Sequence, residues 1–442
     1  TAVATGALGA DTKGSKSTAI GHSALATQNF TTATDSLNTA VGYQAGTAVT
    51  TGIQHTIIGS LAGDALTTGE KNTVLGYQAL TADTTGDRTV AIGHSALYSQ
   101  NITTGAVSYN TAIGGRALRY NSGSYNTAVG NNSLDANGSG SYNTAVGTNS
   151  LSTNTTGSNN TAHGSYSLNR NTTGSNNTAT GRNSLYYNTT GSNNTAFGHA
   201  SLKLSTTAGN NSAFGFEALE QNTTGTQNTA VGSNALDDNT TGNQNIAVGN
   251  GALGHNTTAN YNVAIGSGAL GTVTTSEDNV AVGRAVLYNN TAGANTGIGS
   301  LSLYLNTSGQ FNAGCGRGSL QSNTTGSYNT AMGGYALLVN TTASNNTAVG
   351  YNSLTANTTG TQNNAFGDNA LRSNTTASYN TGLGNNALYT NTTGTQNVAV
   401  GRASLFNNNA NNNTAVGDLA LYSNTSGANN TAVGQNVLGT NT

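Results

Sequence analysis

The sequence predicts an all-β fold, a parallel β-solenoid or β-roll of 25 coils with a 17-residue period. A glycine preceded by Thr-Ala-Val or a close variant recurs at this spacing from Gly42 to Gly434, and a fixed period of this length is typical of stacked repeats. Only 6% of the residues are charged, and the chain has 60 Gly but no Pro or Trp, which is unlike a globular domain. Because Leu and Val keep fixed places in the repeat, we expect order rather than disorder.

We call these repeated glycines the register glycines. Most steps between them are 17 residues, but the steps from Gly21 to Gly42 and from Gly93 to Gly114 are 21, and three others are 16. We expect such length changes in turns, since a change inside a strand would reverse its faces. Residues 1–37 are predicted to form a degenerate N-terminal coil or coils with an insertion. Residues 38–442 are predicted to form the regular solenoid, which we expect to continue beyond the chain end.

Each coil has the consensus N-T-A-V-G-x-x-A/S-L-x-x-N-T-T-G-S-x. N-T-A-V is predicted to be a short strand, in which Asn and Ala face one way and Thr and Val the other. The residue before the register glycine is nearly always apolar, and Leu stands four residues after it in 23 of 25 coils. N-T-T-G-S has the composition of a turn. The predicted core includes Val129, Leu134, Val146, Leu151, Val231 and Leu236.

Asparagine recurs at two places in the coil, four residues before the register glycine and seven after it. Stacked coils would place these amides above one another, as in the amide ladders of cross-β structures. We therefore predict a structural role for both columns. The first column includes Asn126, Asn143, Asn160, Asn177, Asn194 and Asn228.

A single coil of this kind buries little apolar surface for the seventeen residues it orders. We therefore expect several chains to associate laterally, with the small Ala face of one chain packed against that of another. Three chains about an axis is the most economical closed arrangement, although the residues alone leave the number open.

The motif N-T-A-V-G-x-x-A/S-L at residues 126–134, 143–151 and 228–236 resembles two kinds of repeat. It is similar to the head repeats of trimeric autotransporter adhesins and to the repeat shafts of phage and bacterial tail-fibre-like proteins. The resemblance implies a homotrimeric parallel β-roll that is extracellular and serves attachment. The period of 17 is longer than that of the adhesin heads.

We predict no catalytic, cofactor-binding or metal-binding residues. Residues 314–318 (Gly-Cys-Gly-Arg-Gly) look like a phosphate loop but lack its context, and Cys315 takes the place of Val as a small hydrophobe. His163 and Thr180 occupy the same place in the repeat. Copies of His163 could meet at a metal in an oligomer, but a buried His with one hydrogen-bond partner is the favoured interpretation.

Three further features admit a functional interpretation. Lys203, Glu220 and Asp237 are spaced by 17, and we favour a charge ladder over a glycosidase pair of Glu220 and Asp237, because no cleft is indicated. Tyrosines recur beside the turns, where they could stack on sugars or fill grooves between chains. Candidate glycosylation sequons of the form N-T-T include Asn154, Asn171, Asn188 and Asn222, although turn chemistry also explains this motif.

The favoured function is the structural shaft of an extracellular fibre, a viral tail fibre or a bacterial surface adhesin, that presents an attachment function. Expected partners are other copies of the chain and a cell-surface glycan or receptor. A net charge of −2 argues against nucleic acid, and no apolar run is long enough for membrane insertion. The alternatives are a surface that binds glycan or ice, suggested by stacked Thr155, Thr172 and Thr189, and a tailspike that degrades polysaccharide.

Overall fold

The computed structural model describes residues 1–100 and 107–440, and every regular element in these ranges is a β-strand. The chain forms two compact units, Thr1–Thr226 and Gln227–Thr442. Each unit is a parallel β-solenoid with a period of about 17 residues, and the two contain about 25 turns. The all-β class, the solenoid and its period are thus confirmed.

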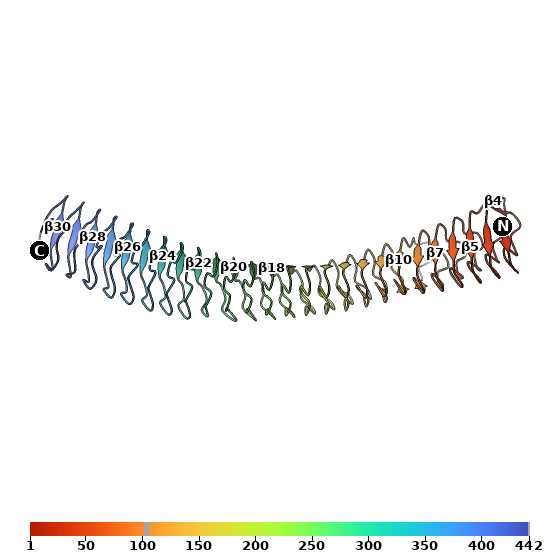
Figure 1. Cartoon of the computed structure of the whole chain (residues 1–442), viewed down its shortest axis with the longest axis horizontal. Helices are drawn as coiled ribbons and strands as arrows, with labels where there is room; N and C mark the ends of the chain where they lie inside the picture. Colours follow the sequence, from red (N-terminus) through yellow and green to blue (C-terminus); the bar gives the residue numbers. More distant parts are fainter. Residues whose placement is uncertain (101–106, 441–442) are drawn as a thin grey trace. The chain divides into compact units, whose positions relative to one another are not determined.

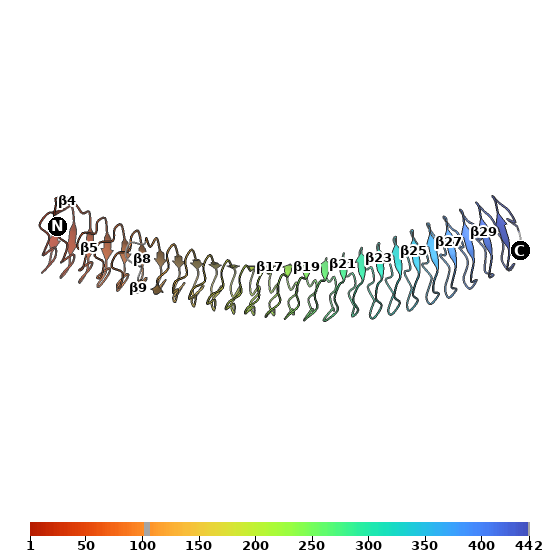
Figure 2. The ribbon, with the colours of Figure 1, turned by 180° about the vertical axis from the view of Figure 1, so that it is seen from behind.

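In the first unit, each coil contributes one short strand to a parallel sheet, and strands that follow one another in this sheet pair in register. Figure 1, and Figure 2 from behind, draw these strands as successive parallel arrows. The strands are β1 (Ala2–Val3), β3 (Thr18–Ile20), β5 (Thr39–Val41), β6 (Thr56–Ile58), β7 (Thr73–Leu75), β8 (Val90–Ile92), β10 (Thr111–Ile113), β12 (Thr127–Val129), β13 (Thr144–Val146), β14 (Thr161–His163), β15 (Thr178–Thr180), β16 (Thr195–Phe197) and β17 (Ser212–Phe214).

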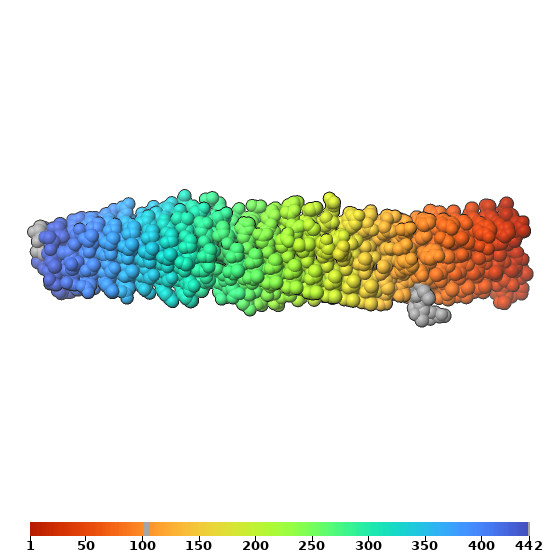
Figure 3. Space-filling view, turned by 90° about the horizontal axis from the view of Figure 1, so that it is seen from below, coloured from red at the N-terminus to blue at the C-terminus, as the bar shows by residue number. Residues whose placement is uncertain are grey.

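The second unit repeats this arrangement, with parallel in-register pairs of successive strands throughout. Its strands are β18 (Thr229–Val231), β19 (Ile246–Val248), β20 (Val263–Ile265), β21 (Val280–Val282), β22 (Thr296–Ile298), β23 (Ala313–Cys315), β24 (Thr330–Met332), β25 (Thr347–Val349), β26 (Asn364–Phe366), β27 (Thr381–Leu383), β28 (Val398–Val400), β29 (Thr414–Val416) and β30 (Thr431–Val433). On the face seen in Figure 3, atoms of neighbouring coils within each unit lie against one another.

The register glycine ends each strand for two reasons. Its φ is positive, for example 133° at Gly147, a conformation that residues with a side chain rarely adopt. In addition, a Cβ at Gly147 would lie 2.6 Å from the carbonyl oxygen of Gly164 in the next coil. Glycine is therefore required both by the backbone conformation and by the close stacking of coils.

The faces of the strand are opposite to those that the sequence analysis assumed. Ala128, Ala145 and Ala230 are fully buried within the coil of their own chain. Val129 and Val146 are only half-buried and Val231 is 38% exposed, so the prediction that these valines form the core is wrong for the single chain. The expectation of Ala-to-Ala packing between chains fails for the same reason. Where the leucine of the repeat also occupies the interior, the space that remains fits the small Ala side chain rather than Val.

Leucine fills most of the remaining interior. Leu134, Leu151 and Leu236 are fully buried, as predicted. The backbone of this leucine is left-handed, with φ of 49° at Leu134 and 50° at Leu151. In that conformation the N–H of Leu134 donates to the carbonyl oxygen of Ser150 in the next coil at 3.0 Å. The turn after the register glycine is therefore hydrogen-bonded from coil to coil, like the strand.

Steps of unusual length leave the strand register unchanged. Ala19 pairs with Ala40 across the first 21-residue step, and Ala112 pairs with Ala128 across a 16-residue step. The first insertion contains β4 (Thr34–Asp35), which pairs in parallel with β2 (Gly14–Ser15) of the preceding coil and forms a small separate sheet. The second insertion includes residues 101–106, which lie outside the described residues, and beside it β9 (Ser99–Gln100) pairs with β11 (Tyr120–Asn121).

The N-terminal segment contains strand structure that the sequence analysis did not resolve. Within residues 1–37, β1 pairs in parallel with β3, so that Ala2 lies opposite Ala19 and Val3 opposite Ile20. Ala4 takes the place of the register glycine and has a φ of 98°. The sequence analysis described residues 1–37 only as a degenerate coil or coils, because the glycine that marks the repeat is replaced by Ala4 in the first of them.

Candidate functional site

The first asparagine column lies inside the coils and joins side chains to the backbone. The backbone N–H of Asn143 donates to Oδ1 of Asn126 at 2.9 Å, and Nδ2 of Asn143 donates to the carbonyl oxygen of Gly157 at 2.9 Å. Every member that the sequence analysis named is buried: Asn126, Asn143, Asn160, Asn177 and Asn194 in the first unit, and Asn228 in the second. The column thus connects each strand to the turn of the next coil.

The second column is an amide-to-amide ladder. Nδ2 of Asn154 donates to Oδ1 of Asn137 at 2.6 Å, and Nδ2 of Asn171 donates to Oδ1 of Asn154 at 2.8 Å. The same Nδ2 of Asn154 also donates to the carbonyl oxygen of Gly157 at 2.8 Å. Both amide hydrogens of Asn154 are therefore used within the fold.

This geometry argues against glycosylation at the four N-T-T asparagines. Asn154, Asn171, Asn188 and Asn222 are fully buried, and each donates from Nδ2 to the carbonyl oxygen of the turn glycine three residues on. A glycan on Nδ2 would replace a hydrogen that is bonded inside the coil. The exposed sequon asparagines are instead those of the N-N-T motif, Asn159, Asn176 and Asn193.

His55 takes an asparagine's place in the first column. Its Nδ1 accepts a hydrogen bond from the N–H of Asn72 at 3.3 Å, the role that Oδ1 has elsewhere. Burial lowers the pKa of the His55 imidazole to about 4, because a charged ring is poorly solvated inside the coil. His55 is therefore neutral at pH 7 and acts as a structural substitute for Asn.

Asp83 takes an asparagine's place in the second column. Its carboxylate accepts hydrogen bonds from Nε2 of Gln100 at 2.5 Å and from the N–H of Gly86 at 3.0 Å. Burial raises the pKa of the Asp83 carboxyl, an effect that the Gln100 hydrogen bond partly opposes. His55 and Asp83 thus preserve the hydrogen bonds of the first and second columns, with an imidazole and a carboxylate in place of an amide.

We call the residues immediately before the register glycines the outer apolar column. Twenty-three of the 25 are Val, Ile, Leu, Phe, Met or Cys, and they lie on the outside of the coils. Strongly exposed members include Ile20, Leu75, Phe197 and Phe214 in the first unit, and Ile298, Met332, Leu383 and Val433 in the second. His163 and Thr180 are the polar exceptions, and they pair in register on β14 and β15. His163 is exposed rather than buried.

The other residues that the sequence analysis considered take part in local contacts or lie exposed at the surface. Nζ of Lys203 lies 2.7 Å from Oε1 of Glu220, so Glu220 belongs to an ion pair. In the second unit, Asp237 accepts a hydrogen bond from Asn234 at 3.1 Å, and burial raises the pKa of its carboxyl. Cys315 is an exposed free thiol on β23. Among the described residues, no three His, Cys, Asp or Glu side chains come close enough together to hold a metal ion.

The threonines considered for ice binding form a bonded column. Oγ1 of Thr155 donates to the carbonyl oxygen of Thr172 at 2.8 Å, and Oγ1 of Thr172 donates to that of Thr189 at 2.9 Å. Each hydroxyl hydrogen is thus directed along the stack. This arrangement adds a third hydrogen-bonded column to the two of asparagine.

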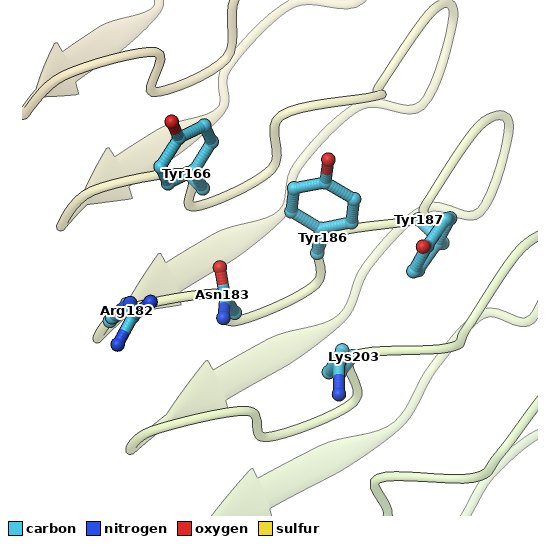
Figure 4. A pocket seen from close by; sticks show the side chains of 6 residues that line it. All are labelled: Tyr166, Arg182, Asn183, Tyr186, Tyr187 and Lys203. Carbon is cyan, nitrogen blue, oxygen red and sulfur yellow. The ribbon is translucent and has the colours of Figure 1, made fainter.

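A surface depression of about 380 Å³ lies on the turn side of the first unit (Figure 4). Three tyrosines and two cations surround it, from three successive coils. The lining residues are Tyr166, Arg182, Asn183, Tyr186, Tyr187 and Lys203. The sequence analysis weighed Tyr186 and Lys203 separately and did not connect them. The signal that could have found this site is a stretch, residues 136–216, without any Asp or Glu.

Comparison with known protein families and with curated proteins gives no match for this sequence. Within the described parts of the chain, no helix has the length and apolar character needed to cross a lipid bilayer.

Proposed function

We propose that this chain is the structural shaft of an extracellular fibre, in which several copies associate side by side along their outer apolar columns. The observation that carries the proposal is that column itself. Contiguous apolar surface larger than a few hundred Å² is rare on monomeric proteins and commonly marks an interface. The continuous hydrogen-bond columns inside each unit support a stiff, load-resisting role.

A second copy of the chain is the partner that fits this surface. The apolar side chains recur once per coil, a spacing of about 4.8 Å in a parallel sheet. Only a partner with the same period can stay in contact over many coils. The column carries few polar groups, so parallel copies would not place like charges together. The resemblance to trimeric adhesin and tail-fibre repeats favours three copies, at a cell or virion surface.

Cys315 provides a direct test of this association. It lies in the outer apolar column between Ile298 and Met332, and it is the one cysteine of the chain. In parallel, in-register copies the Cys315 thiols meet, so mild oxidation should give a covalent dimer on non-reducing gels. Cys315→Ser should abolish this product.

Size-exclusion chromatography with light scattering should give the mass of a trimer, and a monomeric mass without cross-linking would refute the proposal.

Charged substitutions test whether the column is the contact surface. Glutamates at four column positions should leave the coils folded but shift the particle towards a monomer, because each charge would lose its water in the interface. The positions are Ile58, Ile113, Met332 and Leu383. The control places four glutamates at exposed turn threonines: Thr156, Thr190, Thr325 and Thr359. Equal masses for the two variants would argue against the column as the interface.

The shaft role itself is tested by electron microscopy of the full chain. Thin particles of uniform width are expected, and compact globular particles would contradict the proposal.

A thermal-hysteresis assay and a reducing-sugar assay with capsular polysaccharides test the ice-binding and tailspike alternatives, and we expect no activity in either.

A further inference from the structure

The depression on the first unit has the side chains of a ligand site (Figure 4). Tyr166 comes from one coil, Arg182 and Tyr186 from the next, and Lys203 from the one after. The turn after the register glycine positions them: Tyr166 has a left-handed φ of 60°, and Leu185, next to Tyr186, is fully buried. The backbone that carries the site is thus held in place by the hydrogen-bonded turns and the buried leucines of the coils.

The charge around this depression is positive. Residues 136–216 contain Arg170, Arg182 and Lys203 but no Asp or Glu, in a chain with 15 acidic residues overall. Lys203 is paired with Glu220 from outside this stretch. The Arg170 guanidinium carbon lies 4.7 Å from the ring centroid of Tyr187 and 5.6 Å from that of Tyr186.

Arg182 is the cation that remains for a ligand. Its exposed guanidinium makes no ion pair or hydrogen bond with any residue in the described ranges. Arg402, at the same place in a coil of the second unit, instead pairs with Asp418 at 2.9 Å. An unpaired guanidinium beside a depression can bind a carboxylate or sulfate through two parallel hydrogen bonds.

The tyrosine rings of the depression are not stacked face to face. Elsewhere in the first unit, Tyr125 and Tyr142 stack with 5° between their planes, which covers ring faces. Here the planes of Tyr166 and Tyr186 differ by 52°, and those of Tyr186 and Tyr187 by 72°. Tyr166 is 37% exposed. Its ring is therefore available as an apolar platform with a polar hydroxyl at its edge.

We propose that this depression binds an acidic sugar, a pyranose that carries a carboxylate or a sulfate. The sugar ring lies against Tyr166 and Tyr186, the anionic group binds Arg182, and the Asn183 amide offers hydrogen bonds to hydroxyl groups. An apolar wall with a few directed polar groups is the general form of a small-ligand site. This inference goes beyond the shaft role, since it gives one chain a ligand of its own and does not require self-association.

A single-stranded nucleic acid also combines rings with negative charge, but the surface fits it less well. Nucleic-acid binding depends on many cationic contacts to phosphates. This stretch has three cations, two of which already have partners, and the whole chain has a net charge of −2. A short acidic sugar requires only one free guanidinium.

The experiment is isothermal titration calorimetry of the full chain with three tetrasaccharides. The probes are tetragalacturonate, a sulfated κ-carrageenan tetrasaccharide and neutral galactotetraose. Binding of either acidic probe at least tenfold more tightly than the neutral one supports the proposal, and the comparison distinguishes carboxylate from sulfate. Equal binding of all three, or binding of none, would overturn it. So would tighter binding of oligothymidine with the same dependence on Arg182.

Matched variants locate the site. Arg182→Gln should weaken binding of the acidic probe at least tenfold. Tyr166→Asn should weaken it too, and Asn is the common residue at this turn position, as at Asn149, so the fold should persist. Arg317→Gln is the control, because Arg317 has the same place in a coil of the second unit, over the Tyr335 ring. Equal affinities of the Arg182 and Arg317 variants would exclude this site.

Sugar binding and the shaft role can be tested independently of each other. The four-glutamate variant of the outer apolar column should bind the acidic sugar with unchanged affinity, and Arg182→Gln should self-associate like the unaltered chain. Loss of sugar binding in the column variant would show that the site needs more than one chain and would contradict the single-chain proposal.

Discussion

The leucine four residues after the register glycine has a conformation that explains its identity. Its φ is positive in coil after coil, and the two coils without Leu have Gly46 and Gly63 with φ of 59° and 52°. A left-handed backbone is unfavourable for side chains in general and most of all for β-branched ones. The interior nevertheless needs an apolar side chain at this point. Leu satisfies both conditions, whereas Val and Ile satisfy only the second.

This reasoning predicts that Leu151→Ile destabilises its coil although the volume is unchanged. We expect a loss of about 2 kcal/mol, since a β-branched residue in the left-handed region adds to the ordinary penalty. Leu151→Met, which is not β-branched, should cost less than about 1.5 kcal/mol. Amide hydrogen exchange in the neighbouring coils measures both effects. If Ile proves as stable as Met, the left-handed backbone does not select leucine.

His55 makes the stability of its coils depend on pH. Its folded pKa is about 4, below the ordinary value of 6.5. Between these values the unfolded chain takes up a proton that the folded chain does not, so stability is full above about pH 6.5 and falls as the pH falls towards 4. The shift corresponds to about 3 kcal/mol.

His55→Asn should remove this dependence, because it restores the residue usual at this place. The measurement is hydrogen exchange of the neighbouring amides between pH 7 and pH 4, compared between the two chains after correction for intrinsic exchange. Parallel pH profiles would show that the imidazole is not responsible.

The residue scale also shows what the sequence could and could not predict. The two asparagine columns and the buried leucines could be predicted, because each repeats at one place and has one chemical role. The inward face of the strand could not. Alternation in T-A-V tells only that Ala opposes Thr and Val, and the usual preference for burying the larger apolar residue gave the wrong answer. The deciding quantity is the width of the coil, which no single repeat reveals.

At the scale of one element, each coil keeps a similar interior volume. A larger inward side chain at one position of the repeat is accompanied by a smaller one at another. Where Gly46 and Gly63 remove the leucine, Ile57 and Val74 take the place of the inward Ala, and both are fully buried. The opposite exchange occurs in the second unit. There the buried Val286 replaces a smaller residue, and Gly297 replaces the inward Ala of the next strand. A Cβ at Gly297 would lie 2.4 Å from Cγ1 of Val286.

A double-mutant cycle tests this compensation. Gly297→Ala alone should destabilise its coil by about 1–3 kcal/mol through overpacking. Val286→Ala alone should cost about 1–2 kcal/mol by leaving a cavity. The double variant restores the common Ala–Ala pair, so its loss should be smaller than the sum by at least 1 kcal/mol. Additive losses, measured by thermal unfolding, would mean that the two positions are independent.

At the scale of the molecule, the coils of a unit act as exchangeable modules. Steps of 16, 17 and 21 residues all preserve strand register, because the differences are taken up in turns. Stability in such repeats is a sum over coils and their neighbours. The sequence could predict this modularity from its period. For the depression around Arg182 the sequence offers only the stretch without acidic residues, and it does not indicate which side chains of three successive coils meet there, because they share no motif.

Deletion of residues 165–181, one full period of the first unit, should therefore leave a folded chain that is one coil shorter. Circular dichroism should be almost unchanged, and the unfolding midpoint should fall only slightly. Deletion of residues 165–173 removes about half a coil and should unfold the adjoining coils, because Leu and Asn would then face the wrong partners. Equal behaviour of the two deletions would contradict the modular description.

The asparagine columns have a direction, because each Oδ1 in the first column accepts from the residue that follows it along the stack. A unit cut between two coils would consequently expose unlike ends: amide oxygens at one and N–H groups at the other. Two such fragments could rejoin head to tail but not head to head. The cut end of one fragment would therefore bind the complementary end of the other. This polarity gives a simple design for split versions of the protein that assemble by themselves.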